Sequence, residues 1–240
     1  MKKSLLLILA VFSFTFANAQ GFKFGVKGGG NYSSLGGSDK DKVGVYIENN
    51  HWTGDAEYKY GYHMGLTSLL TFDADDFLGL RIDALYTTKG FQVDQTATST
   101  INGVSTTSET QVKRSLNYIS LPILLNINTG GLYFELGPEV AYMTNTTSEI
   151  KRSFTNNNTG DKTDESIKDE YNTSKEDLGS IDFGYIAGLG FQSDMGLGIG
   201  LRYNGGLVSV FDTKNVNSSQ EVNAKNSSFT VSLFYMFGGE

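Results

Sequence analysis

Seven charged side chains stand in the polar phase of segments whose other phase is apolar, and they are the residues best placed for ion or proton chemistry. They are Lys23, Lys27, Arg81, Asp83, Glu135, Glu139 and Arg202. Inside a narrow β-barrel they could form an ion or proton path, or a site for a small substrate. The alternative is a structural plug, because an eight-stranded interior is just wide enough for side chains to fill and buried charges must be paired. We expect the plug.

His51 and His63 are the only histidines in the sequence. An outer-membrane hydrolase or acyltransferase could use either as the base beside a Ser and an Asp. Serines and aspartates are so numerous that a partner is guaranteed, so the pattern carries little weight and we predict no catalytic residue. Trp52, beside His51, could anchor a partner or pack on the rim of a barrel.

Acidic residues in the polar connections could hold a cation. They include Asp39, Asp41, Asp161, Asp164 and Glu165. Their spacing does not match the EF-hand pattern, so a solvated acidic surface is the better interpretation. We therefore predict no metal site and no cofactor.

Eight segments must position these side chains, and in each of them apolar residues alternate with polar or small ones. They cover roughly residues 22–32, 60–72, 78–86, 116–127, 132–143, 181–192, 197–207 and 228–237. A period of two over such lengths is the signature of β-strands. Each segment is about long enough to cross a bilayer at a tilt, and the apolar phase would then face lipid.

The connections between these segments alternate between long and short. Short turns rich in Asp, Asn and Gly cover 73–76, 128–131 and 193–196, and long polar connections cover 33–59, 92–115, 144–180 and 208–227. Up-and-down barrels of outer membranes have short periplasmic turns and longer external loops. We therefore predict an all-β, eight-stranded antiparallel up-and-down transmembrane β-barrel with short periplasmic turns, long extracellular loops and both termini in the periplasm.

Two of the long connections carry signals of further β-structure. Asn102-Gly103 lies between two Thr-rich arms and suits a type I′ turn, which predicts a hairpin that continues two strands beyond the membrane. A ten-stranded arrangement stays open if residues 43–47 and 56–60 form a separate hairpin.

Aromatic residues gather at the ends of the predicted strands, where the aromatic girdles of membrane barrels lie. The predicted interface aromatics are Phe22, Tyr32, Tyr60, Phe72, Tyr86, Tyr118, Tyr142, Phe191, Tyr203 and Phe237.

The N-terminus has the form of a secretory signal peptide over residues 1–19. Lys2 and Lys3 precede an uncharged apolar run, and Ala17-Asn18-Ala19 is a small-x-small cleavage site. Residues 20–240 would then form the barrel domain, and loss of the two lysines takes the net charge from −7 to −9. A chain this acidic lacks the basic face that nucleic acids require. The absence of Cys excludes disulfides from its stability.

Several motifs resemble those of the PorT-type outer-membrane β-barrel family of Bacteroidota. They are Leu80-Arg81-Ile82-Asp83-Ala84-Leu85-Tyr86 with Lys89-Gly90, Asn117-Tyr118-Ile119-Ser120-Leu121-Pro122, Gly137-Pro138, Asp182-Phe183-Gly184 with Gly188-Leu189-Gly190, and Leu201-Arg202-Tyr203 with Gly206-Leu207. Asp83 and Ser120 stand where the family often has Glu. The resemblance implies the outer membrane of a Gram-negative bacterium, insertion by the barrel-assembly machinery, and a link to protein secretion for some members. Membrane-barrel chains often end on an aromatic residue. Here the final aromatic, Phe237, is followed by three more residues.

These observations predict a non-enzymatic outer-membrane protein that acts structurally or through its four long connections. The expected partners are outer-membrane lipid, the assembly machinery and an envelope or extracellular protein. A narrow, porin-like pore for ions or small solutes is the alternative, and an outer-membrane lipid-modifying enzyme is the second.

Overall fold

The computed structural model describes residues 21–40, 43–47, 50–73, 75–169, 178–211 and 223–237. The predicted signal peptide, residues 1–19, lies outside this part of the chain, as do Asp41 and the three residues after Phe237. No helix in the described ranges is long and apolar enough to cross a membrane.

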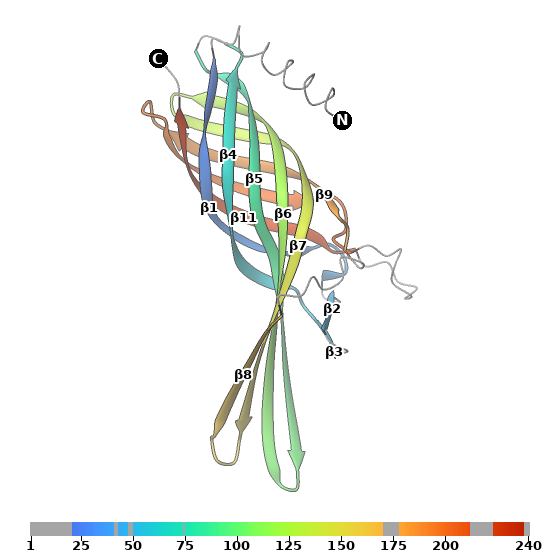
Figure 1. Cartoon of the computed structure of the whole chain (residues 1–240). Coiled ribbons are helices and arrows are strands. Elements are labelled where there is room, and N and C mark those ends of the chain that lie inside the picture. The colour runs from blue at the N-terminus through green and yellow to red at the C-terminus, as the bar shows by residue number, and fades with distance from the viewer. Residues whose placement is uncertain are drawn as a thin grey trace.

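Within the described ranges, eight antiparallel strands close a ring (Figure 1). They are β1 (Phe22–Gly36), β4 (Glu57–Thr71), β5 (Leu78–Ile101), β6 (Val104–Thr129), β7 (Leu132–Asn156), β9 (Ile181–Gln192), β10 (Leu197–Gly206) and β11 (Lys225–Phe237). Each strand pairs with the next one of the ring, and β1 pairs with β11 to complete it. The predicted eight-stranded, up-and-down barrel is confirmed.

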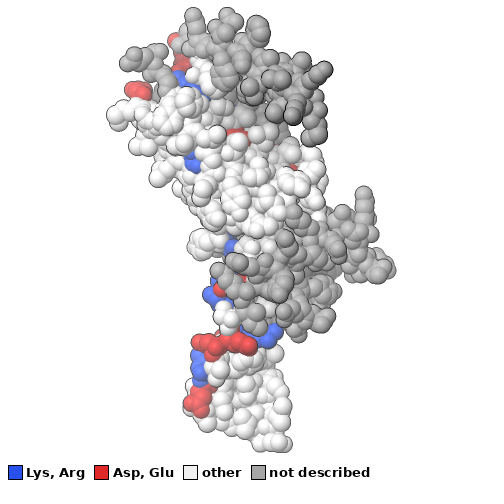
Figure 2. Space-filling view, viewed as in Figure 1, with Lys and Arg blue, Asp and Glu red and all other residues white. Residues whose placement is uncertain are grey.

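Alternation along each strand separates an apolar outer face from a mixed inner one. In β11, Val231 and Leu233 are about half exposed, whereas Ser232 and Phe234 between and beyond them are buried. The same pattern runs around the ring, and Figure 2 shows a wall with few charged atoms. Exposed apolar side chains in a continuous band suit contact with lipid rather than with water.

Short turns join the ring strands at one end, which we call the turn end. In the turn between β4 and β5, the Asp73 carboxylate accepts hydrogen bonds from the backbone N–H groups of Phe77 (2.7 Å) and Leu78 (3.0 Å). In the turn between β6 and β7, Gly130 and Gly131 have φ values of 72° and 100°, a region that favours glycine. The first and last described residues also lie at the turn end (Figure 1).

At the opposite end, the ring strands β5, β6 and β7 continue beyond the ring as long arms, and a further strand pairs with β7 there (Figure 1). The pairing of β5 with β4 ends at Gln92, and the pairing of β7 with β9 ends at Tyr142. We call this four-stranded extension the blade; it comprises residues 93–101 of β5, 104–112 of β6, 148–156 of β7, and β8 (Lys162–Asp169).

The hairpin predicted at Asn102-Gly103 is confirmed. Ile101 faces Val104 across the turn. Asn102 and Gly103 have φ values of 51° and 78°, as a type I′ turn requires. The blade is larger than expected, because β7 and β8 add a second hairpin. The polar sequence of residues 144–180 did not predict it.

The ten-stranded alternative is wrong. β2 (Val43–Ile47) pairs with β3 (Asn50–Gly54) in a separate two-stranded sheet. Residues 57–60, which that alternative placed opposite 43–47, belong to β4 and pair within the ring.

Candidate functional site

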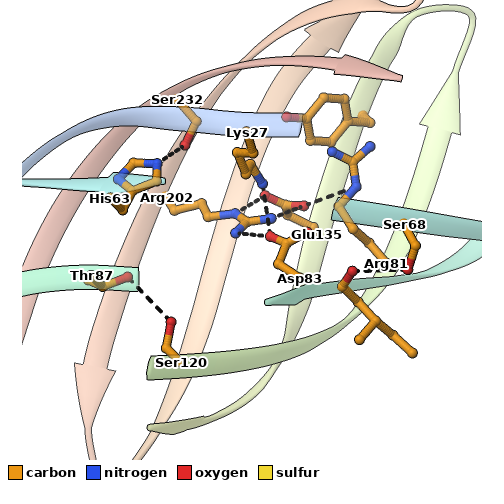
Figure 3. Close-up of polar contacts among 12 residues, drawn as sticks. Lys27, His63, Ser68, Arg81, Asp83, Thr87, Ser120, Glu135, Arg202 and Ser232 are labelled. Atoms are coloured by element: carbon orange, nitrogen blue, oxygen red, sulfur yellow. Dashed lines mark hydrogen bonds and ion pairs between the residues drawn. The ribbon is translucent and has the colours of Figure 1, made fainter. Parts of the chain in front are cut away.

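The centre of the barrel is occupied by an ion cluster built around Arg202 (Figure 3). The Arg202 guanidinium donates to both carboxylate oxygens of Glu135, at 3.0 Å for Nη2 to Oε2, and to Asp83 Oδ2 at 2.7 Å. Lys27 Nζ donates to the same Asp83 oxygen at 3.0 Å. All four side chains are almost fully buried. The fork of Arg202 therefore joins two carboxylates that come from different strands, in the bidentate geometry that suits Arg.

Arg81 extends this cluster toward the turn end. Its guanidinium lies 4.6 Å from the ring centre of Tyr133 and 4.7 Å from that of Phe234, and its Nε lies 3.8 Å from Glu135 Oε2. Such cation–π contacts offset part of the cost of burying a charge. Glycine makes room for these rings, since a Cβ at Gly198 would overlap the ring of Phe234.

A second ion cluster lies nearer the blade. Lys89 Nζ donates to Glu139 Oε2 at 2.9 Å and lies 3.8 Å from Asp182 Oδ2. Asn204 donates to Glu139 (3.3 Å), and Asn226 donates to Asp182 (2.8 Å). Glu139 was expected in the lumen, but Lys89 and Asp182 were missed. Strand parity was the available signal, because Lys89 shares the inward phase of Arg81 and Asp83.

A hydrogen-bonded chain of Asn31, His63 and Ser232 lies between the clusters. The Asn31 amide nitrogen donates to the backbone carbonyls of Tyr62 and Thr88. Its Oδ1 therefore accepts from Nδ1 of His63 at 2.6 Å, and Nε2 of His63 accepts from the Ser232 hydroxyl at 2.8 Å. This assignment of the His63 proton follows from the network. The order Ser–His–Asn matches that of a nucleophilic triad.

The space beside this chain is very small. The cavity lined by His63, Ser232, Glu139 and Arg202 has a volume of about 10 Å³, which is room for roughly one water molecule. All three members of the Ser–His–Asn chain are buried. An acyl group cannot reach Ser232 in this arrangement.

Apolar layers close the lumen on both sides of the ion clusters. Toward the turn end, Leu69, Tyr133, Phe234 and Met236 pack together. Toward the blade lies a larger buried cluster: Leu35, Phe91, Val93, Val112, Leu116, Tyr118, Ala141, Met143, Ile150, Leu178, Val210 and Ala224. The described interior is thus filled by charged layers between apolar ones, as expected for eight strands.

Lys23 does not join the central cluster, although it was expected among the lumen charges. It ion-pairs with Asp76 at 2.7 Å in the turn between β4 and β5, where both side chains are partly exposed. Burial raises the pKa of the Asp76 carboxyl, but hydrogen bonds from Lys23 and Thr71 and the Lys23 charge outweigh burial and hold that pKa below its ordinary value. Lys23 therefore stabilises the turn between β4 and β5.

One predicted interface aromatic is wrongly placed. Tyr118 is buried in the lumen, and its hydroxyl accepts a hydrogen bond from Asn226 at 3.1 Å. Its neighbour Ile119 is half exposed on the outer face, so parity puts Tyr118 inside. The other predicted aromatics lie in the outward phase or, like Phe72, just beyond a strand: Phe22, Tyr32, Tyr60, Phe72, Tyr86, Tyr142, Phe191, Tyr203 and Phe237.

The remaining candidates stay apart from one another. Asp39 accepts from the Asn223 N–H (2.9 Å), Asp161 accepts from Thr159 (2.8 Å), and Asp164 lies 3.8 Å from Lys162. Glu165 is exposed on β8. In the described ranges, no group of three or more His, Cys, Asp and Glu side chains is arranged to hold a metal ion. His51 and Trp52 lie on β3, and their side chains are outside the described part.

Comparison with known proteins gives one broad match. The model of a family described as "Outer membrane protein beta-barrel domain" matches residues 16–212. No curated protein sequence matches the chain.

Several solved barrels are similar in structure at low identity. Ail, the attachment invasion locus protein of Yersinia pestis, is 13% identical, with 90% of this chain and 99% of that chain covered and a TM-score of 0.36. Neisserial surface protein A is 10% identical, with 91% and 100% covered and a TM-score of 0.39. The outer membrane protease OmpT of Escherichia coli is 10% identical, with 92% and 98% covered and a TM-score of 0.30. None of these likenesses assigns a role to this chain.

Proposed function

The chain belongs to the outer membrane protein β-barrel domain family, and from this premise we propose that it is a non-enzymatic surface protein whose blade makes contacts outside the cell. The barrel would serve as a closed membrane anchor, with the turn end and both termini in the periplasm. The long connections would face outward, as in other membrane barrels.

One observation carries this proposal. In the described ranges, apolar layers close the lumen on both sides of the ion clusters, while β5, β6 and β7 extend far beyond the ring with β8 paired to β7. Transport needs an open interior, which eight strands rarely provide. Strands that pair beyond the membrane are not needed to close the ring. Their paired length therefore supports a role of the blade in contacts outside the cell.

Removal of the blade tests the proposal. Residues 94–111 and 149–168 would each be replaced by a two-residue turn, which keeps the ring strands. We expect the variant to reach the outer membrane and to remain heat-modifiable on gels, while adhesion of producing cells to one another or to surfaces falls to the level of cells without the protein. Unchanged adhesion would refute the proposal, as would failure of protease to cleave the wild-type blade on intact cells.

A second candidate function is an acyl-transferring or hydrolytic enzyme, because Ser232, His63 and Asn31 form the order of a triad. The cavity beside them is too small for an acyl group. We therefore expect a fluorophosphonate probe to leave the folded protein unlabelled. Labelling that disappears in Ser232→Ala, with the barrel still heat-modifiable, would favour the enzyme.

Within the family, we assign the chain to the PorT-type barrels on the motifs around Arg81, Pro122 and Arg202. A component of protein secretion is then one class of envelope partner. Loss of an exported protein from the medium of a deletion strain would support this assignment.

A further inference from the structure

Among the described residues, no strand ladder continues along the outer edge of β5 in the blade. The pairing with β4 ends at Gln92, and β3 passes beside β5 without a ladder to it. Residues 96–101 are exposed. An edge of this kind presents free backbone donors and acceptors to any further strand.

The turn geometry shows which groups point outward. Residues that flank a two-residue hairpin turn form a hydrogen-bonded pair, and bonded and non-bonded pairs then alternate along the ladder. Ile101 and Val104 flank this turn. The backbone N–H and C=O groups of Thr96, Thr98 and Thr100 therefore point away from β6, toward the open edge.

The two edges of the blade differ in charge. Five of the eight residues of β8 are charged: Lys162, Asp164, Glu165, Lys168 and Asp169. Charges on an edge strand oppose the addition of another strand. Residues 95–103 carry none. In Figure 2 the lower part of the blade is charged along one side and uncharged on the other.

We propose that the β5 edge pairs with the β5 edge of a second copy of this chain, antiparallel and across a two-fold axis near Thr98. This inference rests on the proposed function, because it requires the blade to face outward. Two acidic copies could meet here without charge repulsion. Thr96 would face Thr100 of the other copy, and such Thr–Thr pairs stabilise a sheet.

The pairing fixes the orientation of the two molecules. β5 runs outward from the barrel, so an antiparallel partner must run in the opposite direction. The second barrel must then lie in a facing membrane and not in the same one. An overlap of residues 93–103 spans about 34 Å, so each blade tip would reach the rim of the other barrel. The interaction therefore joins two cells or two vesicles.

Charge-swap variants in reconstituted vesicles test this pairing. We expect vesicles that contain the wild-type full chain to cluster in light scattering. Thr98→Glu and Thr98→Lys should each abolish clustering, because like charges would face each other, and a mixture of the two should restore it. Thr163→Glu, on the charged β8 edge, is the matched control and should cluster as the wild type does.

The remaining outcomes overturn the inference. They are wild-type vesicles that stay dispersed, clustering with protein-free vesicles, clustering that persists in Thr98→Glu, and a mixture that does not recover. Because Thr98→Glu retains the blade, clustering that is lost on blade removal but unchanged in Thr98→Glu would leave the proposed function standing and refute this pairing alone.

Discussion

At the scale of single residues, the charges in the lumen are linked closely enough that few can be removed separately. Arg202 bridges Glu135 and Asp83, and Lys27 donates to the same Asp83 oxygen. Removing one partner of a buried ion pair leaves an uncompensated buried charge. The resulting loss of stability exceeds the stability that the intact pair contributes. The position of each charge in the sequence therefore constrains residues on several strands at once.

Arg202→Met should lower the free energy of unfolding by about 3–5 kcal/mol, because Glu135 would lose its bidentate partner in a buried site. The measurement is urea unfolding in lipid vesicles, followed by the heat-dependent shift on gels. Lys151→Met is the matched control, since Lys151 is half exposed and lies 3.6 Å from Glu149; it should change stability by less than about 1 kcal/mol. Equal effects of the two substitutions would contradict the buried network.

Strand parity predicted from sequence the inward position of six of the seven expected charges, all except Lys23, but not how they pair. Asp83 lies on β5 and its partner Arg202 on β10, and these strands are not neighbours in the ring. Their contact depends on ring closure across the lumen, which no local pattern encodes. The Ser–His–Asn chain also escaped prediction, because Ser232 on β11 reaches His63 on β4 only through the β1–β11 pairing that closes the ring.

At the scale of elements, the blade hairpin depends on its turn more than the ring strands depend on theirs. Beyond the ring, residues 96–101 are exposed and, among the described strands, pair only with β6. Such a hairpin has little apolar burial to hold it. The sequence predicted this hairpin through Asn102-Gly103, whereas the longer connection between β7 and β8 was not recognised as a hairpin turn.

Gly103→Ala should destabilise the β5–β6 hairpin by about 1–2 kcal/mol, because Ala is strained at positive φ. Hydrogen exchange should then be roughly 5–30-fold faster for amides of residues 104–110, and unchanged in the ring. Gly160→Ala, at a φ of 79° in the β7–β8 connection, should accelerate exchange in that hairpin only. Uniform acceleration throughout the barrel would show that the blade and ring unfold together.

At the scale of the whole molecule, the alternation of long and short connections predicted the barrel before any contact was known. That pattern depends on chain length between strands, which the sequence gives directly. What fills the lumen is set by tertiary contacts, and the length of the blade by pairing between β6 and β7. Neither follows from periodicity alone.

The filled lumen should not conduct. We expect no steady single-channel steps when the heat-modifiable protein is reconstituted in planar bilayers, because apolar layers lie on both sides of the ion clusters. Bilayers treated with detergent alone provide the baseline. Steady steps that change size in Glu135→Gln would instead support the pore.

The seam between β1 and β11 has a kinetic consequence. It joins the first and last strands of the ring, which are the most distant ring strands in the chain, and contacts of this kind slow folding. Until the final strand is delivered, β1 presents an open edge that can aggregate. We therefore expect the chain to reach its membrane unfolded and shielded, and the ring to close there only when β11 meets β1.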